Sequence, residues 1–465
     1  MTKALPRSKM LRYCLADIAK GLFNGMIGNY LLYFFQPTVK SGLPSLLPQN
    51  KLLGFLTVMA LITALGKIVD AVTDPLVATL SDKCTHKAGR RMPFLRFAAI
   101  PYALSVLLIF YAPFPQGSWA NALWVGIFLV TYYTAYTFFF IPKNALVPEI
   151  IPDAKVRVGY YGISTAFFMG SSSFMYAATL FVDLLKKAGL SPLWAWRTVF
   201  TFFAAIGITC LLLSAYAFEE KDNVTGNVRP TESLLRSCAQ VLRNRNFLVF
   251  AAGDLFSGVS MAFFQTAMLY YITMLLNVPE RQSFLVMLSA IGVALCLFPL
   301  IIKISRKYNK KVPLVAASIV FTVVFAFIFF GDKIAALAPG YELFIGLGMG
   351  VVVAFPFAAI NILPQSVLSD IIQCDSLESG INREGIFSAT KTFIEKCAAA
   401  LAMMVVSSVL AIGAGAGESV GLLGVKLTGV FAGGFSLVSL LFFLFYNDKK
   451  VTARIAGHTS KEASK

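Results

Sequence analysis

The sequence predicts an all-α integral membrane protein with about 12 transmembrane helices in two halves of six. Of its 465 residues, 57% are hydrophobic and 14% aromatic, and the mean hydropathy is +0.74, far above the range usual for soluble domains. Apolar runs of about 20 residues recur along the whole chain, and each is long enough to cross the ~30 Å hydrocarbon core of a bilayer. One long polar interval interrupts the series near the middle of the chain.

Each apolar run predicts one membrane-spanning helix. The first six predicted spans are residues 11–35, 52–80, 93–112, 119–141, 158–182 and 195–218. The second six are residues 247–276, 283–302, 312–330, 337–363, 385–412 and 421–446. The first run is too long for the core of a signal peptide and lacks a small-residue cleavage site, so we expect it to remain in the protein as a helix.

The polar interval separates two halves that resemble each other. We expect an N-terminal half at 1–218, a cytoplasmic loop at 219–245, a C-terminal half at 246–446 and a cytoplasmic tail at 447–465. A basic segment ending in proline follows the second span and the eighth, at 81–93 and 305–313. A segment from Asn to Pro closes the fourth span and the tenth, at 144–148 and 361–364. These matches indicate two parallel repeats, the architecture of the major facilitator superfamily, although any cytoplasmic connection favours a basic turn with a proline.

Topology explains the net charge of +17. The basic residues gather in alternate connections, such as 83–91 and 303–311, whereas the connections at 112–118 and 413–419 carry almost none. By the positive-inside rule, both termini and the central loop lie in the cytoplasm. The basic excess therefore predicts no nucleic-acid partner.

Histidine and cysteine usage points away from metal sites and disulfides. His86 and His458 fall in predicted cytoplasmic segments without a cluster of ligands, so we expect no metal site beyond a bound Na⁺. The seven cysteines are odd in number and lie in predicted helices or cytoplasmic loops, so a disulfide framework is not expected. No cofactor other than a coupling ion is expected.

Three charged residues, Lys67, Asp70 and Asp74, fall inside the second predicted span. Spacings of three and four place them on one face of a helix. Each charge at mid-bilayer costs roughly 2.5–3.5 kcal/mol, so three unpaired charges would cost on the order of 8–10 kcal/mol. They form either an internal ion pair that ties helices together or a cation or proton site on a transport path, which the surplus negative charge favours. In the second interpretation Lys67 takes part in coupling.

Three separated motifs carry a family resemblance. The first is KIVDAVTDP at 67–75, with SD at 81–82 and GRRMP at 89–93. The second is PKNALVPE at 142–149. The third is Asp370-x4-Asp375-x7-Arg383-Glu384-Gly385, followed by Thr392-Phe393-x2-Lys396. In order and spacing, over nearly the full chain, the sequence resembles the glycoside–pentoside–hexuronide:cation symporter family. The resemblance implies a multi-pass carrier of the cytoplasmic (inner) membrane that couples solute uptake to Na⁺ or H⁺ by alternating access between the halves.

The resemblance to the melibiose permeases of that family implies a cation site in the N-terminal half. Their two helix-II aspartates align with Asp70 and Asp74, and a helix-IV threonine ligand aligns with Thr137. A family asparagine is here Thr73, which keeps an oxygen but loses the amide, and a helix-XI lysine that takes part in coupling aligns with Lys396. Carboxylate and hydroxyl oxygens suit a hard cation, and protons would use the same two carboxylates.

The resemblance carries over poorly to the sugar side. The family's sugar-binding aspartate of helix I falls at Gly21, its helix-IV aspartate at Phe140 and its helix-V arginine near Thr165. Those charged groups normally bind sugar hydroxyls. The resemblance therefore does not support a galactoside as the solute.

Other polar residues of the spans are candidates for solute binding. They are Asp17, Lys20, Lys143, Asn144 and Gln265. Two interpretations of Lys20 and Lys143 stand. Either they bind an acidic solute such as a uronate, or their ammonium groups extend to the cytoplasmic interface, which their positions near predicted helix ends favour. The same choice applies to Asp17.

Charged residues at the cytoplasmic ends of the spans are candidates for a gate. One group comprises Asp82, Arg90 and Arg91, and the other comprises Asp370, Asp375, Arg383 and Glu384. A surface ion pair is usually worth under ~1 kcal/mol, but a network made in one conformation and broken in the other biases an equilibrium. We expect both groups to form ion pairs that close the inner gate.

The sequence therefore favours a secondary active transporter that carries a sugar, glycoside or related polar solute with Na⁺ or H⁺. The alternative is a cation-coupled carrier of a lysophospholipid or other amphiphile, with which the lost sugar ligands and the 42 Phe residues agree. An enzyme is not expected, because no nucleophile–base set, metal cluster or nucleotide loop appears. The expected partners are the solute, the cation and the lipid bilayer, and the expected functional unit is a monomer.

Overall fold

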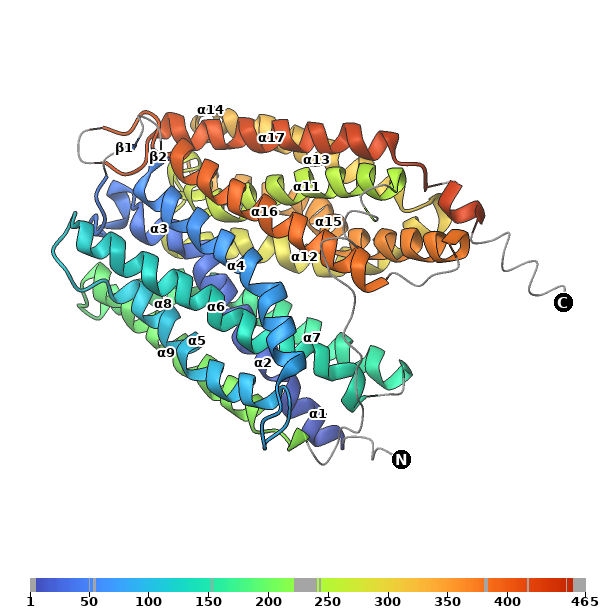
Figure 1. The fold of residues 1–465 in the computed structure, drawn as a ribbon. Helices are drawn as coiled ribbons and strands as arrows, with labels where there is room; N and C mark the ends of the chain where they lie inside the picture. Colours follow the sequence, from blue (N-terminus) through green and yellow to red (C-terminus); the bar gives the residue numbers. More distant parts are fainter. Residues whose placement is uncertain are drawn as a thin grey trace. The chain divides into compact units, whose positions relative to one another are not determined.

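The computed structural model describes residues 6–49, 51–52, 56–151, 154–220, 241, 244–379, 384–415, 418–448 and 450–454. The contacts within the chain divide it into two compact units, each built from long helices (Figure 1). Unit 1 comprises Met1–Pro230 and Ala411–Gly421, and unit 2 comprises Thr231–Leu410 and Leu422–Lys465. The division differs from the predicted halves at Ala411–Gly421, where the Ser419 hydroxyl lies 3.3 Å from the Ser45 hydroxyl of unit 1.

The helices of unit 1 follow the first six predicted spans in order. The first span contains α1 (Arg7–Cys14), α2 (Ala16–Gly25), the π-helix η1 (Met26–Tyr30) and α3 (Leu31–Phe35). After it come η2 (Val39–Ser41), the antiparallel strands β1 (Lys51–Leu52) and β2 (Leu56–Thr57), and α4 (Val58–Lys83). The unit continues with α5 (Met92–Tyr111), α6 (Trp119–Ile150), α7 (Ala154–Phe174), η3 (Met175–Ala177), α8 (Ala178–Lys187) and α9 (Pro192–Ala215).

Unit 2 follows the second six predicted spans. Its helices are α11 (Arg245–Tyr270) with the π-helix η5 (Tyr271–Leu275), α12 (Glu280–Tyr308), α13 (Lys311–Phe329), the short α14 (Gly331–Leu337), α15 (Glu342–Ser379), α16 (Glu384–Leu410) and α17 (Leu422–Phe445). Within the unit, α12 packs against α15, and α11 packs against both α16 and α17. A hydrophobic core that includes Phe247, Phe250 and Phe443 fills the space between them.

Ten helices in the described part of the chain are long and apolar enough to cross a membrane. The other two predicted spans, α1 to α3 and α4, carry more polar residues. Every 18-residue stretch of α4 contains Lys67, Asp70 and Asp74. The opposite face of α4 exposes apolar side chains, among them Leu65 and Ile68, as a lipid-facing surface does. The predicted all-α membrane fold is confirmed.

Side-chain oxygens begin several of these helices. Thr57 Oγ1 accepts a hydrogen bond from the N–H of Ala60 at 3.1 Å at the start of α4. Ser118, Ser191 and Asn244 cap α6, α9 and α11 in the same way. Such caps satisfy N–H groups that have no partner within the helix, and each contributes about 1 kcal/mol.

Glycines allow α2 to approach α7 closely. A Cβ atom on Gly21 would lie 2.0 Å from Ser171 Oγ and 2.4 Å from the carbonyl oxygen of Phe168. A Cβ on Gly25 would lie 2.7 Å from the Cβ of Met175. Small residues at such positions let two membrane helices pack backbone to backbone. Position 21, with which the resemblance aligns a sugar-binding aspartate, therefore has no room for a larger side chain.

Three predicted helix ends are wrong. The apolar runs predict ends at 141, 302 and 363, whereas α6 runs to Ile150, α12 to Tyr308 and α15 to Ser379. α15 continues through Pro356 and Pro364. Within membrane helices a proline is tolerated where neighbouring groups satisfy the freed carbonyl. The end of an apolar run marks where polar residues begin, not where the helix stops.

Candidate ion and solute sites

Four oxygen-bearing side chains from α4 and α6 meet in unit 1. Thr137 Oγ1 lies 3.1 Å from Asp74 Oδ1 and 3.4 Å from Asp70 Oδ1. Thr73 Oγ1 lies 3.4 Å from Thr137 Oγ1. Asp70 and Thr137 are buried, and Thr73 and Asp74 are half-buried. The structure thus brings together the four residues that were predicted to bind the cation.

Lys67 lies one turn before Asp70 and two turns before Asp74 on α4. Its Nζ is 4.5 Å from the centre of the Tyr133 ring of α6. Such a cation–π contact contributes roughly 0.5–2 kcal/mol and holds the ammonium group at this level of the helix. Lys67, Asp70 and Asp74 together carry a formal charge of −1. One monovalent cation would neutralise it.

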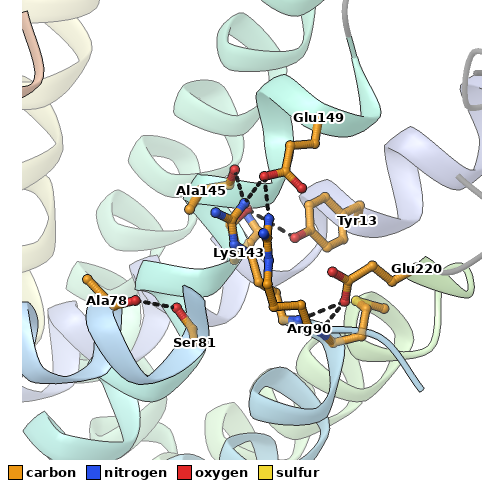
Figure 2. A network of polar contacts seen from close by, with 10 residues as sticks. Tyr13, Ala78, Ser81, Arg90, Lys143, Ala145, Glu149 and Glu220 are labelled. Carbon is orange, nitrogen blue, oxygen red and sulfur yellow. Dashed lines mark hydrogen bonds and ion pairs between the residues drawn. The ribbon is translucent and has the colours of Figure 1, made fainter. Parts of the chain in front are cut away.

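A buried polar network joins α2, α6 and α7. Lys143 Nζ lies 2.8 Å from Asp17 Oδ2, and Ser164 Oγ donates to the same oxygen at 2.6 Å. The Tyr13 hydroxyl donates to the backbone oxygen of Lys143 at 3.1 Å (Figure 2). Lys143 is 1% exposed and Asp17 is 4% exposed. The favoured expectation that they extend to the interface is wrong, because α6 continues to Ile150 and holds Lys143 inside the bundle.

Lys20 lies beside this network, among aromatic rings. Its Nζ is 5.1 Å from the ring centre of Phe168, 5.3 Å from that of Phe140 and 5.8 Å from that of Tyr136. Asn144, which follows Lys143, is exposed. Lys143 Nζ lies 5.7 Å from the centre of the same Phe140 ring, so the structure brings the predicted residues Asp17, Lys20 and Lys143 together beside this ring.

Glu149 of α6 pairs with the basic residues that precede α5. Arg90 Nη2 lies 2.8 Å from Glu149 Oε1 (Figure 2), and Arg91 Nη1 lies 2.7 Å from the same atom. Arg91 also donates to the backbone oxygen of Ala145. The side chain of Asp82, the predicted partner, lies outside the described residues. Arg90 and Arg91 of the predicted gating group therefore pair with an acidic residue that was not assigned to the gate, Glu149.

Glu220 caps the start of α5. Its Oε2 accepts hydrogen bonds from the N–H groups of Arg91 at 2.7 Å and Met92 at 2.9 Å. Gly89, with φ +117°, allows this approach, since a Cβ there would lie 2.4 Å from the same oxygen. A carboxylate is favourable here because the N-terminus of a helix presents unpaired N–H groups and the positive end of its dipole. Glu220 thus fixes the segment that holds Arg90 and Arg91.

In unit 2, a second buried ion pair joins α11 to α16. Lys391 Nζ lies 3.0 Å from Asp254 Oδ2, and it also contacts Glu395 one turn later on α16. Asp254 and Lys391 are buried. Together with Gln265, a predicted solute-binding residue, they line a cavity of about 410 Å³.

The second predicted gating group has partners elsewhere in unit 2. Lys310 Nζ lies 2.6 Å from Asp370 Oδ2, and Asn244 Nδ2 donates to Asp375 Oδ1 at 3.2 Å. Arg383 and the side chain of Glu384 lie outside the described residues. Lys396 is half-buried on α16 of unit 2, and its part in coupling stays a prediction.

Sequence reasoning missed the partners more often than the charged residues themselves. Ser164, Glu149 and Lys310 were not assigned, since each contacts a partner that is distant along the chain. Two signals were available. Glu149 closes the PKNALVPE motif, and Lys391 and Glu395 have the spacing of four that pairs side chains on one helix face.

The sequence model of one protein family, described as MFS/sugar transport protein, matches residues 12–446. The chain is 23% identical to the putative glycoside/cation symporter YagG of Escherichia coli, over 76% of this chain and 74% of that protein. It is 21% identical to the lactose permease of Lactobacillus helveticus, over 87% of this chain and 62% of that protein. The solved structure of the nucleoside transporter NupG has a TM-score of 0.66 at 13% identity, covering 95% of this chain and 99% of that chain. The fold is therefore that of the major facilitator superfamily.

Proposed function

Because the chain belongs to the MFS/sugar transport protein family, we propose that it carries a sugar, glycoside or related polar solute together with Na⁺ or H⁺. The chain is a multi-pass membrane transporter and not an enzyme. Relatives described as a glycoside/cation symporter and a lactose permease support the solute class.

The cluster of Asp70, Thr73, Asp74 and Thr137 is the main support for ion coupling. Its oxygens come from two helices and lie 3.1–3.4 Å apart. Hard cations prefer carboxylate and hydroxyl oxygens. Lys67, Asp70 and Asp74 together carry a formal charge of −1, which one Na⁺ or one proton would balance. An internal ion pair alone would need no second carboxylate.

The proposal includes the orientation of the chain in the cytoplasmic membrane. Both termini lie in the cytoplasm, because the basic connections, including the Arg90–Arg91 segment and Lys310, then face the inside. The ion pairs of Arg90 and Arg91 with Glu149, and of Lys310 with Asp370, belong to the inner gate and are made in one conformation and broken in the other. The transporter works as a monomer.

Uptake of a panel of labelled sugars into proteoliposomes tests the proposal. An imposed Na⁺ gradient or pH gradient should drive at least one sugar above its outside concentration, and an ionophore that dissipates the gradient should abolish this accumulation. Equilibration without accumulation would contradict symport. Accumulation of a lysophospholipid and no sugar would establish the amphiphile alternative instead.

Replacing Lys396 with Ala is expected to reduce gradient-driven uptake more than solute exchange. By the family resemblance, Lys396 supplies the positive charge that compensates the carboxylates when no ion is bound, and only net uptake requires the carrier to return empty. Both rates are measured in the same vesicles, with Lys333→Ala, an exposed lysine of α14, as the control. Equal losses in uptake and exchange at normal membrane levels would indicate a general structural role.

Melibiose is expected to be a poor solute. Position 21 has no room for an aspartate, Phe140 is 1% exposed, and Thr165 cannot supply an arginine's charge. Each missing hydrogen bond to a charged group removes roughly 1.5–3 kcal/mol of binding, so three would lower the affinity by orders of magnitude. Uptake of labelled melibiose below 1 mM is the measurement, and strong Na⁺-stimulated accumulation would refute this expectation.

A further inference from the structure

The cavity in unit 2 is lined by residues of α11, α15 and α16. Its volume of about 410 Å³ lies within the roughly 300–1,000 Å³ of ligand sites. Its polar lining residues are Asp254, Gln265, Asn361, Gln365, Lys391 and Glu395. Each of the three helices contributes two of them, so a solute in the cavity would meet polar groups on every wall.

The polar groups are spread along the cavity rather than concentrated at one point. Asp254 and Gln265 are eleven residues apart on α11, which corresponds to three turns and about 16 Å. Asn361 and Gln365 on α15, and Lys391 and Glu395 on α16, are each one turn apart. Met261, Ile360 and Pro364 supply apolar surface between them. This alternation suits a molecule that has hydroxyl groups at its edges and carbon–hydrogen surface on its faces.

The charges of the cavity disfavour an anionic solute. Lys391 is already paired with Asp254 at 3.0 Å and contacts Glu395, so its positive charge is compensated within the cavity. The two carboxylates and one ammonium leave a formal charge of −1. The carboxylates accept hydrogen bonds from hydroxyl groups, and the amides both donate and accept. An acidic group would be repelled by the surplus carboxylate.

We infer that this cavity binds an uncharged, hydroxyl-rich part of the solute, such as a neutral sugar ring, and discriminates against uronic acids. The inference rests on the proposed function and narrows its solute class. It differs from the acidic solute that Lys20 and Lys143 suggested in the sequence, and of these two lysines Lys143 has its charge compensated by Asp17.

Binding to the purified full-length protein tests the inference. The probes are neutral pentoses, hexoses and their methyl glycosides, each compared with the matching uronic acid where one exists. At least one neutral sugar should bind saturably, about tenfold or more tighter than its uronic acid. Gln365→Leu should weaken that binding about tenfold by removing hydrogen bonds to a hydroxyl. Gln373→Leu, an exposed glutamine on the same helix, should leave it unchanged.

Glu395→Gln provides a separate test of the charge argument. It removes the surplus negative charge, so it should narrow the difference between neutral and acidic sugars several-fold, whereas Glu418→Gln in an exposed loop should not. The melting temperature of each variant shows whether it is folded. The inference would be overturned if the wild type bound the uronic acids as tightly as the neutral sugars or more tightly, or if it bound no neutral sugar. Equal effects of Gln365→Leu and Gln373→Leu on binding would overturn it as well.

Transport of the same sugars separates this inference from the proposed function. Gradient-driven accumulation of a uronic acid that Gln365→Leu does not impair would overturn the cavity assignment but leave the symporter intact. Selective binding of a neutral sugar without any gradient-driven accumulation would support the cavity and contradict symport.

Discussion

Asp70→Asn and Asp74→Asn are each expected to abolish cation-driven accumulation of solute while the protein remains folded in the membrane. Asn has nearly the same shape as Asp but carries no charge, so either change brings the formal charge of Lys67, Asp70 and Asp74 from −1 to zero. The Thr137 hydroxyl, 3.1 Å from Asp74 and 3.4 Å from Asp70, would keep a neighbour in both variants. Losing one charged ligand should weaken cation binding roughly 10- to 150-fold. Gradient-driven uptake in proteoliposomes is the measurement.

Asp183→Asn is the matched control for these variants. Asp183 is a half-buried aspartate of α8 in the same unit, and it pairs with the exposed Lys187 of its own helix rather than with the four-oxygen cluster. Its neutralisation should leave uptake unchanged. Solute exchange and membrane levels show whether each variant is intact. If both Asp70→Asn and Asp74→Asn concentrate solute as the wild type does, the carboxylates are not ligands of the coupling ion.

The cation cluster was predictable because of where its charges lie. A charge inside an apolar span costs free energy unless it is compensated. The spacing of Lys67, Asp70 and Asp74 therefore already indicated a functional site on one helix face. Their spacing gave no information about the partner helix. Thr137 lies 63 residues from Asp74 and came only from the family resemblance. The structure adds that the two helices bring these side chains within hydrogen-bonding distance.

Partners on other helices could not be predicted from the sequence. Arg90 and Arg91 were assigned to Asp82, the nearest carboxylate along the chain, whereas the described contacts include Glu149, 58 or 59 residues away. Lys143 was placed near the membrane surface because the apolar run stops at 141. The helix continues to Ile150, so Lys143 lies about two turns before its end. Helix packing decides which group compensates a buried charge, and the residues near that charge in the sequence do not predict the packing.

Lys143→Met is expected to destabilise the protein strongly. The change removes the ammonium group 2.8 Å from Asp17 and leaves that carboxylate 4% exposed, with the Ser164 hydroxyl as its described hydrogen-bond donor. Breaking a buried ion pair by removing one partner typically costs 3–5 kcal/mol, because the remaining charge stays buried without compensation. The free energy of unfolding of the purified protein, measured by denaturant titration, should fall by about that amount.

Two further variants decide whether the buried charge causes this loss. Adding Asp17→Asn to Lys143→Met removes the carboxylate that has lost its ion-pair partner, so the double variant should recover much of the lost stability despite carrying two changes. Lys187→Met breaks the exposed pair with Asp183, which has nearly the same length of 2.9 Å, and should cost under ~1 kcal/mol because water screens that pair. A double variant less stable than Lys143→Met, or equal losses for Lys143→Met and Lys187→Met, would show that lost packing rather than the buried charge accounts for the effect.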